Sequence, residues 1–215
     1  MTLPLFSDDS CKTVETLGPG AILLRRFATD EAAKLMSTVD SVTAAAPFRQ
    51  MVTPGGFTMS VSMTNCGNAG WVTDRRGYRY QSTDPQTGFP WPGMPVALAE
   101  FAECAATAAG FAGFAPDACL INRYEPGSKL SLHQDRDERD MTQPIVSVSL
   151  GLPATFLFGG LRRSERPRRI VLAHTDVVVW GGPSRLVFHG IDRLSEGDHP
   201  LTGRCRLNLT FRRAL

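Results

Sequence analysis

His133 and Asp135 are the first residues of the sequence whose types and spacing could carry chemistry. Residues i and i+2 of an extended segment point the same way, so one imidazole and one carboxylate converge on one point. His189 is the best third ligand because it ends a predicted strand, whereas His174 and His199 lie beside predicted turns. Two histidines and a carboxylate leave open positions on a metal ion, which is typical of non-haem iron(II) oxygenases. The alternative is a solvated His and Asp, because this short spacing also arises by chance.

The second chemical feature is the alternating segment RLNLTFR, which begins at Arg206. In a strand, its apolar residues face one side while Arg206, Asn208 and Arg212 face the other. Two arginines and an asparagine suit a small dicarboxylate held by fork-shaped, charge-assisted contacts. Asn122 and Tyr124, on a common face of another predicted strand, repeat this theme. The alternative is an amphipathic strand with its polar face in water, and the dicarboxylate interpretation is favoured only together with the metal ligands.

Helical periodicity is limited to two segments. Apolar residues recur at helical spacing over residues 32–42, and either Thr29 or Asp30 is expected to cap this helix. The second helix should begin at Pro95, a good first helical residue, and end at Gly110. Both are expected to cover one side of a sheet.

The remainder of the chain is rich in short β-type runs separated by Gly, Pro, Asn and Asp. The predicted strands are Ala21–Phe27, Phe57–Met63, Cys119–Tyr124, Ile145–Leu152, Thr155–Phe158, Ile170–Ala173, Asp176–Trp180, Arg185–His189 and Arg204–Arg212. Most strands follow the helices, which disfavours an alternating parallel α/β sheet. We therefore expect a mainly β fold with helices (α+β), in which a double-stranded β-helix (jelly-roll) core carries amino-terminal helices.

Length and composition fit one domain over residues 1–215, without repeats or low-complexity linkers. No stretch is long and apolar enough to cross a bilayer, and the amino terminus MTLPLFSDDS lacks a basic-then-apolar leader pattern. We therefore expect a cytoplasmic protein without a membrane partner. Five dispersed cysteines without a CxxC pair argue against a disulfide framework or a structural zinc site. The net charge of +2 is too small to produce an electrostatic field over the whole protein that would indicate a polyanionic partner.

Taken together, the His-x-Asp pair, the distant His and the RxNxTxR strand resemble the AlkB family of nucleic-acid dealkylases. The similarity extends over nearly the whole chain. The matching segments are PFRQMVTPGG (Pro47–Gly56), MTNCG (Met63–Gly67), DPQTG (Asp84–Gly88), PDACLINRY (Pro116–Tyr124), KLSLHQD (Lys129–Asp135), PIVSVSLGLPA (Pro144–Ala154), DVVVWGG (Asp176–Gly182) and NLTFR (Asn208–Arg212). Such coverage is more specific than any single motif.

This resemblance implies three groups of site residues. The iron(II) ligands are His133, Asp135 and His189. The contacts to the cosubstrate 2-oxoglutarate are Asn122, Tyr124, Arg206, Asn208 and Arg212. The substrate contacts are Trp71, Tyr78, Asp137 and Arg163. Within the second group, Arg206 is implied to pair with the distal carboxylate of the cosubstrate, and Arg212 to lie near its metal-side carboxylate.

The resemblance also implies the reaction. It is the oxidative demethylation of bases such as 1-methyladenine and 3-methylcytosine, using O2 and 2-oxoglutarate and releasing formaldehyde and succinate. Alkylated single-stranded DNA is the implied partner, with duplex DNA and RNA as further candidates, and a monomer is expected. Residues 47–83 would form a nucleotide-recognition lid. These lesions are cationic, so the aromatic face of Trp71 and the carboxylate of Asp137 suit them, although Asp137 alone would pass for part of a solvated charged loop.

Three alternatives remain open at the level of sequence. A non-catalytic nucleic-acid-binding β-domain would use the arginines and aromatic residues to bind strands and leave the histidines incidental. A dioxygenase with the same chemistry could act on a protein or a small molecule. A double-sheet metal isomerase is the third, but it gives no reason for two arginines on one strand.

Overall fold

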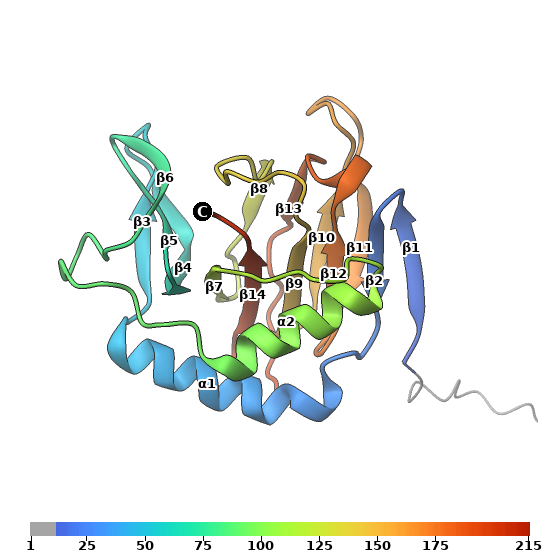
Figure 1. The fold of residues 1–215 in the computed structure, drawn as a ribbon, viewed down its shortest axis with the longest axis horizontal. Helices are drawn as coiled ribbons and strands as arrows, with labels where there is room; N and C mark the ends of the chain where they lie inside the picture. Colours follow the sequence, from blue (N-terminus) through green and yellow to red (C-terminus); the bar gives the residue numbers. More distant parts are fainter. Residues whose placement is uncertain (1–11) are drawn as a thin grey trace, which may run out of the picture.

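The computed structural model describes residues 12–215 and is built around one large mixed-length antiparallel sheet (Figure 1). Residues 1–11, which hold Cys11 and the amino-terminal stretch without a leader pattern, lie outside that range. The strands of the large sheet, in spatial order, are β1 (Val14–Gly18), β2 (Ala21–Leu24), β12 (Val177–Trp180), β9 (Ile145–Gly151), β14 (Arg206–Arg212), β7 (Ala118–Tyr124), β4 (Thr58–Gly67) and β3 (Arg49–Val52).

A second sheet of four strands faces the first. Its spatial order is β11 (Arg168–Leu172), β10 (Ala154–Phe158), β13 (His189–Ile191) and β8 (Leu130–His133). A separate hairpin of β5 (Gly70–Asp74) and β6 (Gly77–Gln81) stands beside β3 and β4 at one end of the molecule (Figure 1). Two facing antiparallel sheets make the jelly-roll core that the strand pattern predicts.

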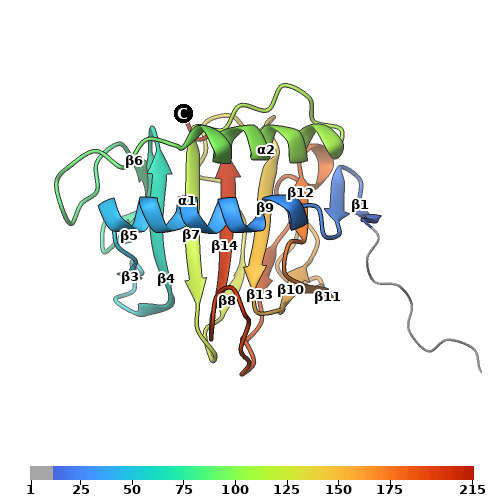
Figure 2. The same cartoon turned by 90° about the horizontal axis from the view of Figure 1, so that it is seen from below.

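The helices α1 (Ala32–Ala45) and α2 (Val96–Ala108) run across one face of the large sheet (Figure 2). Their apolar residues recur at helical spacing and are buried, as Leu35 and Val39 are in α1 and Leu98 and Phe101 in α2. The predicted cap of α1 is wrong. Thr29 and Asp30 lie in a short 3-10 helix that precedes α1, and Glu31 at the cap position makes no side-chain capping bond.

Two apolar layers flank the large sheet. One lies between this sheet and the two helices, where Leu207, Leu209 and Phe211 of β14 are buried. The other lies between the two sheets and includes Phe156 and Trp180. The central strand β14 is buried along its whole length, so its polar residues also face inward rather than into water. The solvated-strand interpretation of this segment is therefore wrong.

The strand prediction over Arg185–His189 is wrong for most of its length. A 3-10 helix (Gly182–Ser184) precedes Arg185, and the strand β13 begins at His189 instead of ending there. The guanidinium of Arg185 explains this, since it donates to the carbonyl groups of Gln143 and Asp135 and fixes an irregular segment in place of a ladder. The sequence also did not predict β1, β3, β5, β6 or β8 as separate strands.

No helix among residues 12–215 combines the length and apolar character that crossing a bilayer requires. The four cysteines in this part of the chain, Cys66, Cys104, Cys119 and Cys205, are free thiols.

Candidate active site

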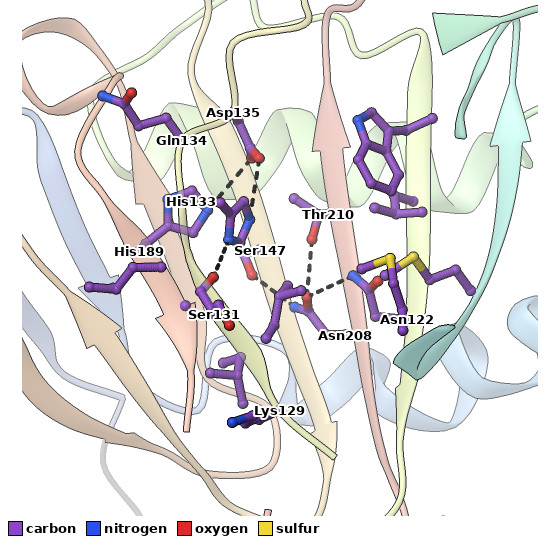
Figure 3. Close-up of a pocket in the computed structure, with 18 of the residues that line it drawn as sticks. Asn122, Lys129, Ser131, His133, Gln134, Asp135, Ser147, His189, Asn208 and Thr210 are labelled. Atoms are coloured by element: carbon purple, nitrogen blue, oxygen red, sulfur yellow. Dashed lines mark hydrogen bonds and ion pairs between the residues drawn. The ribbon is translucent and has the colours of Figure 1, made fainter. Parts of the chain in front are cut away.

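The pairing of β8 with β13 brings the three predicted metal ligands together. His133 is the last residue of β8, and the ladder places it directly opposite His189, the first residue of β13. Asp135 follows β8 by two residues and turns its carboxylate toward both imidazoles (Figure 3). One potential ligand atom from each of the three residues lies within 4.8 Å of the other two.

Backbone hydrogen bonds set the histidine tautomers. His133 Nδ1 lies 2.9 Å from the carbonyl oxygen of Ser131, and His189 Nδ1 lies 3.1 Å from that of Val187. A carbonyl oxygen can only accept, so each Nδ1 carries a proton and donates it. Each Nε2 lone pair is therefore free and points toward Asp135, at 3.6 Å from Oδ1 for His133 and 3.8 Å from Oδ2 for His189. This is the arrangement that orients imidazole ligands at metal sites.

The electrostatics keep Asp135 and His189 in the form that binds a metal. Burial alone would raise the pKa of Asp135, but the positive charge of Arg212 and the nearby histidines outweigh it, and the pKa is lowered. Burial and the neighbouring His133 lower the pKa of His189 to about 4. Asp135 is thus an ionised carboxylate and His189 a neutral imidazole near neutral pH.

Arg206 is a buried cation that the protein does not neutralise. It is 1% exposed, and no acidic side chain of residues 12–215 lies within ion-pair distance. Its Nη2 donates to Ser149 Oγ at 3.0 Å and its guanidinium lies 5.1 Å from the ring centre of Tyr124, but Nε and Nη1 have no partner. Burial lowers the pKa of Arg206, and Tyr124 compensates only in part. Such a group calls for an anion that is not part of the chain.

Asn208 of β14, which also carries Arg206, lies opposite Asn122 of the neighbouring strand β7 (Figure 3). The amide of Asn208 is engaged within the protein: Nδ2 donates to Ser147 Oγ and to the carbonyl of Val148, and Oδ1 accepts from Thr210. Asn122 Oδ1, by contrast, is buried without a partner among the described residues. Contacts within the protein therefore hold the Asn208 side chain in place, whereas Asn122 Oδ1 can still accept a hydrogen bond.

Arg212 differs from Arg206 in having carboxylate partners. Its Nη2 and Nε donate to Asp135 Oδ2 at 2.7 and 3.0 Å, and Nε also lies 3.3 Å from Glu138 Oε1. Burial opposes its charge, but these partners outweigh it and raise the pKa of Arg212. In the structure Arg212 thus forms an ion pair with Asp135, a predicted metal ligand, while its contact with the metal-side carboxylate of the cosubstrate stays a prediction.

The predicted substrate residues lie at the mouth of the same cavity. Trp71 and Tyr78 stack with their ring centres 5.6 Å apart and their planes inclined by 18°. Trp71 Nε1 donates to Asp137 Oδ2 at 2.8 Å. Arg163 is exposed and places its guanidinium 5.7 Å from the ring centre of Phe188.

One cavity of about 780 Å³ brings together all twelve predicted site residues. Other residues that line or support it were not among the predicted site residues, notably Ser147, Tyr80 and Glu138. The alternation of Ser147 with apolar residues along β9 was a usable signal, because alternate residues of a strand share a face. Glu138 had no such signal, since it lies in the charged run RDERD and only its tertiary neighbours set it apart.

The residues present fit a divalent transition metal with a dicarboxylate beside it. Two imidazoles and one carboxylate on one side of an ion are the donor set of non-haem iron(II) oxygenases. The partnerless nitrogens Nε and Nη1 of Arg206 leave N–H donors free for a carboxylate in the same cavity. The arrangement can therefore bind a small dicarboxylate together with a metal that keeps open positions.

Comparisons with known proteins agree with this geometry. Residues 20–212 match the family model of the 2OG-Fe(II) oxygenase superfamily. The chain is 60% identical, over 99% of its length and 98% of the other protein, to the alpha-ketoglutarate-dependent dioxygenase AlkB of Salmonella typhimurium. It is 40% identical, over 63% of its length and 34% of the other protein, to the nucleic acid dioxygenase ALKBH1 of Mus musculus. The solved structure of OsALKBH1 superposes with a TM-score of 0.81 at 30% identity, covering 94% of this chain and 100% of that one.

Proposed function

Because the chain belongs to the AlkB family of the 2OG-Fe(II) oxygenase superfamily, we propose that it repairs alkylated nucleic acids by direct oxidation. It is an iron(II)- and 2-oxoglutarate-dependent dioxygenase that dealkylates nucleic-acid bases. The observation that carries this function is the buried, unneutralised Arg206 in the same cavity as the His133–Asp135–His189 cluster. Neither a strand-binding β-domain nor a metal isomerase requires that pair of features.

We assign the metal to the Nε2 atoms of His133 and His189 and to the carboxylate of Asp135. Iron(II) with 2-oxoglutarate and dioxygen supplies the oxidation, in which the cosubstrate loses carbon dioxide to become succinate and the N-methyl carbon gains a hydroxyl group and leaves as formaldehyde. Arg206 holds the distal carboxylate of the cosubstrate through its partnerless nitrogens. The buried apolar lining of the cavity keeps water away from these groups and strengthens their electrostatic contacts.

The proposed substrates are 1-methyladenine and 3-methylcytosine in single-stranded DNA, with RNA and duplex DNA as further candidates. The stacked faces of Trp71 and Tyr78, with the carboxylate of Asp137 hydrogen-bonded to Trp71, suit a flat and positively charged base. Each lesion lies on the base-pairing edge, so the base must leave the stack to enter the cavity, and extraction costs least from a single strand.

We further propose that residues 47–83 act as a nucleotide-recognition lid within a single domain, and that the enzyme works as a cytoplasmic monomer. The support for a lid is that Thr53, Phe57 and Trp71 of this segment line the cavity from one side. Sedimentation at working concentration would test the monomer, and a dimer would contradict it.

The direct test is a single-stranded oligonucleotide bearing 1-methyladenine, incubated with iron(II), ascorbate and 2-oxoglutarate. We expect loss of the methyl group, release of formaldehyde and succinate formation stimulated by the oligonucleotide. Matched arms with methylated RNA and methylated duplex rank the substrates. Succinate released without any effect of an alkylated nucleic acid would instead favour a protein or small-molecule substrate.

A further inference from the structure

The hairpin β5–β6 is fastened to the loop that carries Asp135 by two hydrogen bonds at matched positions. Trp71 and Tyr80 are directly opposite each other on the two strands, so their side chains share one face. Trp71 Nε1 donates to Asp137 Oδ2 at 2.8 Å, and Tyr80 Oη donates to Glu138 Oε1 at 2.8 Å. Two opposite residues of the hairpin thus hold two consecutive carboxylates of the loop.

The two bonds differ in their surroundings. The bond from Trp71 is exposed at the cavity mouth, where Asp137 is placed to meet a substrate. The bond from Tyr80 lies deeper and ends on Glu138, whose side chain is only 2% exposed. An outer bond of this kind can be exchanged for a ligand, whereas the inner bond stays with the protein.

Glu138 is paired on both of its oxygens. Oε2 accepts from Arg185 Nη2 at 3.0 Å, and Oε1 lies 3.3 Å from Arg212 Nε. Arg185 also donates from Nη1 to the carbonyl oxygen of Asp135 at 2.7 Å. The carboxylate of Glu138 therefore fixes the two arginines that hold the backbone and the side chain of one metal ligand.

These contacts form a continuous path from the half-buried Tyr80 of the hairpin to the buried Asp135. It runs from Tyr80 Oη to Glu138, from Glu138 to Arg212, and from Arg212 Nη2 to Asp135 Oδ2 at 2.7 Å. Removing one partner from a buried, charge-assisted pair leaves the others with unmet hydrogen bonds, so a change at one end is felt at the other.

We propose that Glu138 is a positioning residue that couples docking of the β5–β6 hairpin to the orientation of Asp135. The inference deepens the proposed function and rests on its metal ligands. A docked hairpin holds Tyr80 against Glu138, which keeps Arg212 on Asp135 and so shapes the metal site. Coupling between two binding events is reciprocal, so metal binding must in turn stabilise the docked hairpin.

The experiment uses Mn(II) alone as a redox-silent probe on the full chain, compared among wild type, Tyr80→Phe and Glu138→Gln. Electron paramagnetic resonance measures the Mn(II) affinity, and hydrogen exchange measures protection of residues 70–81 with and without the ion. For Glu138→Gln we expect Mn(II) affinity about 10- to 100-fold weaker, the usual effect of losing a group that supports a ligand. For wild type, Mn(II) should slow exchange in the hairpin, and for Tyr80→Phe this slowing should be lost.

Glu196→Gln is the matched control, because it also removes a carboxylate paired with an arginine (Arg204), but at an exposed site outside the cavity. It should behave as wild type in both measurements. If near-ultraviolet circular dichroism shows that Glu138→Gln does not fold, the same two measurements on Tyr80→Phe and Glu138→Asp test the coupling instead. Two results together would overturn the coupling. Mn(II) would still slow hydrogen exchange in the hairpin of Tyr80→Phe, and Glu138→Gln would bind Mn(II) as tightly as wild type. Wild type that binds no Mn(II) would instead overturn the ligand assignment of the proposed function.

Discussion

Two arginines of β14 show how differently one side-chain type can be used at the scale of a residue. Arg212 is held by Asp135 and Glu138 and belongs to the support of the metal site. Arg206 has two guanidinium nitrogens without partners, so the ligand-free protein bears the cost of a desolvated cation. The first arginine should contribute to stability, whereas the second should oppose it until a dicarboxylate binds.

Replacing Arg206 with Met should therefore have opposite effects on stability and binding. Removing an uncompensated buried charge should raise the free energy of unfolding of the ligand-free protein by about 1 kcal/mol or more. Losing two charge-assisted hydrogen bonds should weaken 2-oxoglutarate binding about 100-fold or more. Urea unfolding and a fluorescence titration with 2-oxoglutarate measure the two effects. A destabilised variant with unchanged cosubstrate binding would show that Arg206 serves the fold.

Replacing Asp135 with Ala should abolish demethylation while the fold persists, because Arg212 keeps its contact with Glu138. Single-turnover succinate formation and circular dichroism test the two parts of this prediction. Asp140→Ala is the control on the same loop, since Asp140 bonds to Thr142 and does not line the cavity. Normal turnover by Asp135→Ala would exclude Asp135 as a metal ligand.

At the scale of elements, the close contact between β8 and β13 sets the distance between the two histidines. Gly190 follows His189, and a Cβ atom there would lie 2.6 Å from the carbonyl oxygen of Leu130. A clash with backbone cannot be relieved by a side-chain rotation. The glycine thus allows the two short strands to approach so closely that the ring centres of His133 and His189 lie 4.4 Å apart.

Substituting Gly190 with Ala should push these strands apart and weaken metal binding by about tenfold or more, as expected when ligands leave their geometry. Competition with a colorimetric chelator measures the affinity. Gly93→Ala is a suitable control, because a Cβ at Gly93 would meet nothing within 4 Å. Equal metal affinities for the two variants would contradict the role given to the β8–β13 approach.

The turn around His174 should make stability depend on pH. His174 Nδ1 accepts from Gly151 N at 3.0 Å, and burial together with the adjacent His199 lowers the pKa of His174 from 6.5. The folded state binds this proton less readily than the unfolded state, so the contribution is present above pH 6.5 and lost as the pH falls toward the folded pKa. Urea unfolding should show a smaller loss on acidification for His174→Gln. An identical loss of unfolding free energy on acidification in wild type and His174→Gln would contradict the prediction.

Some helices and strands can be predicted from their own residues better than others. The alternation over Arg206–Arg212 and the apolar runs of β7, β9 and β12 predict those strands, because burial on one or both faces leaves a regular pattern. The hairpin β5–β6 was not predicted, since its strands are short and a run of charged residues at 74–76 joins them. The segment at Arg185 looked like a strand, and only contacts with distant backbone carbonyls show otherwise. The clustering of His133, Asp135 and His189 could likewise be predicted, but the contacts of Glu138 could not, because they depend on distant residues.

At the scale of the whole molecule, binding of the polyanionic substrate must rely on local charge. The net charge is only +2, but Lys129, Arg136 and Arg163 all line the cavity. Each phosphate neutralised on a single strand releases condensed counterions, which contributes about −0.7 to the slope of log affinity against log salt concentration. Basic residues at one opening, rather than a charged surface overall, would thus guide the strand.

The affinity for a short single-stranded oligonucleotide should therefore fall with salt with a shallow slope of about −2, corresponding to three contacts. Arg163→Gln should lower the magnitude of that slope by about 0.7. Fluorescence anisotropy across a series of salt concentrations measures both values. A far steeper slope in wild type would indicate an extended binding track beyond the cavity mouth.

The two faces of strand β14 line different parts of the molecule. Its apolar residues pack beneath the helices, while Arg206 and Arg212 face the cavity. Side chains alternate strictly along a strand, so inserting or deleting one residue here would exchange the two sets. Guanidinium groups would then be driven into hydrocarbon and leucines into the reaction chamber. Natural variation in this stretch should accordingly proceed by substitution, and length changes should be confined to the loops at either end.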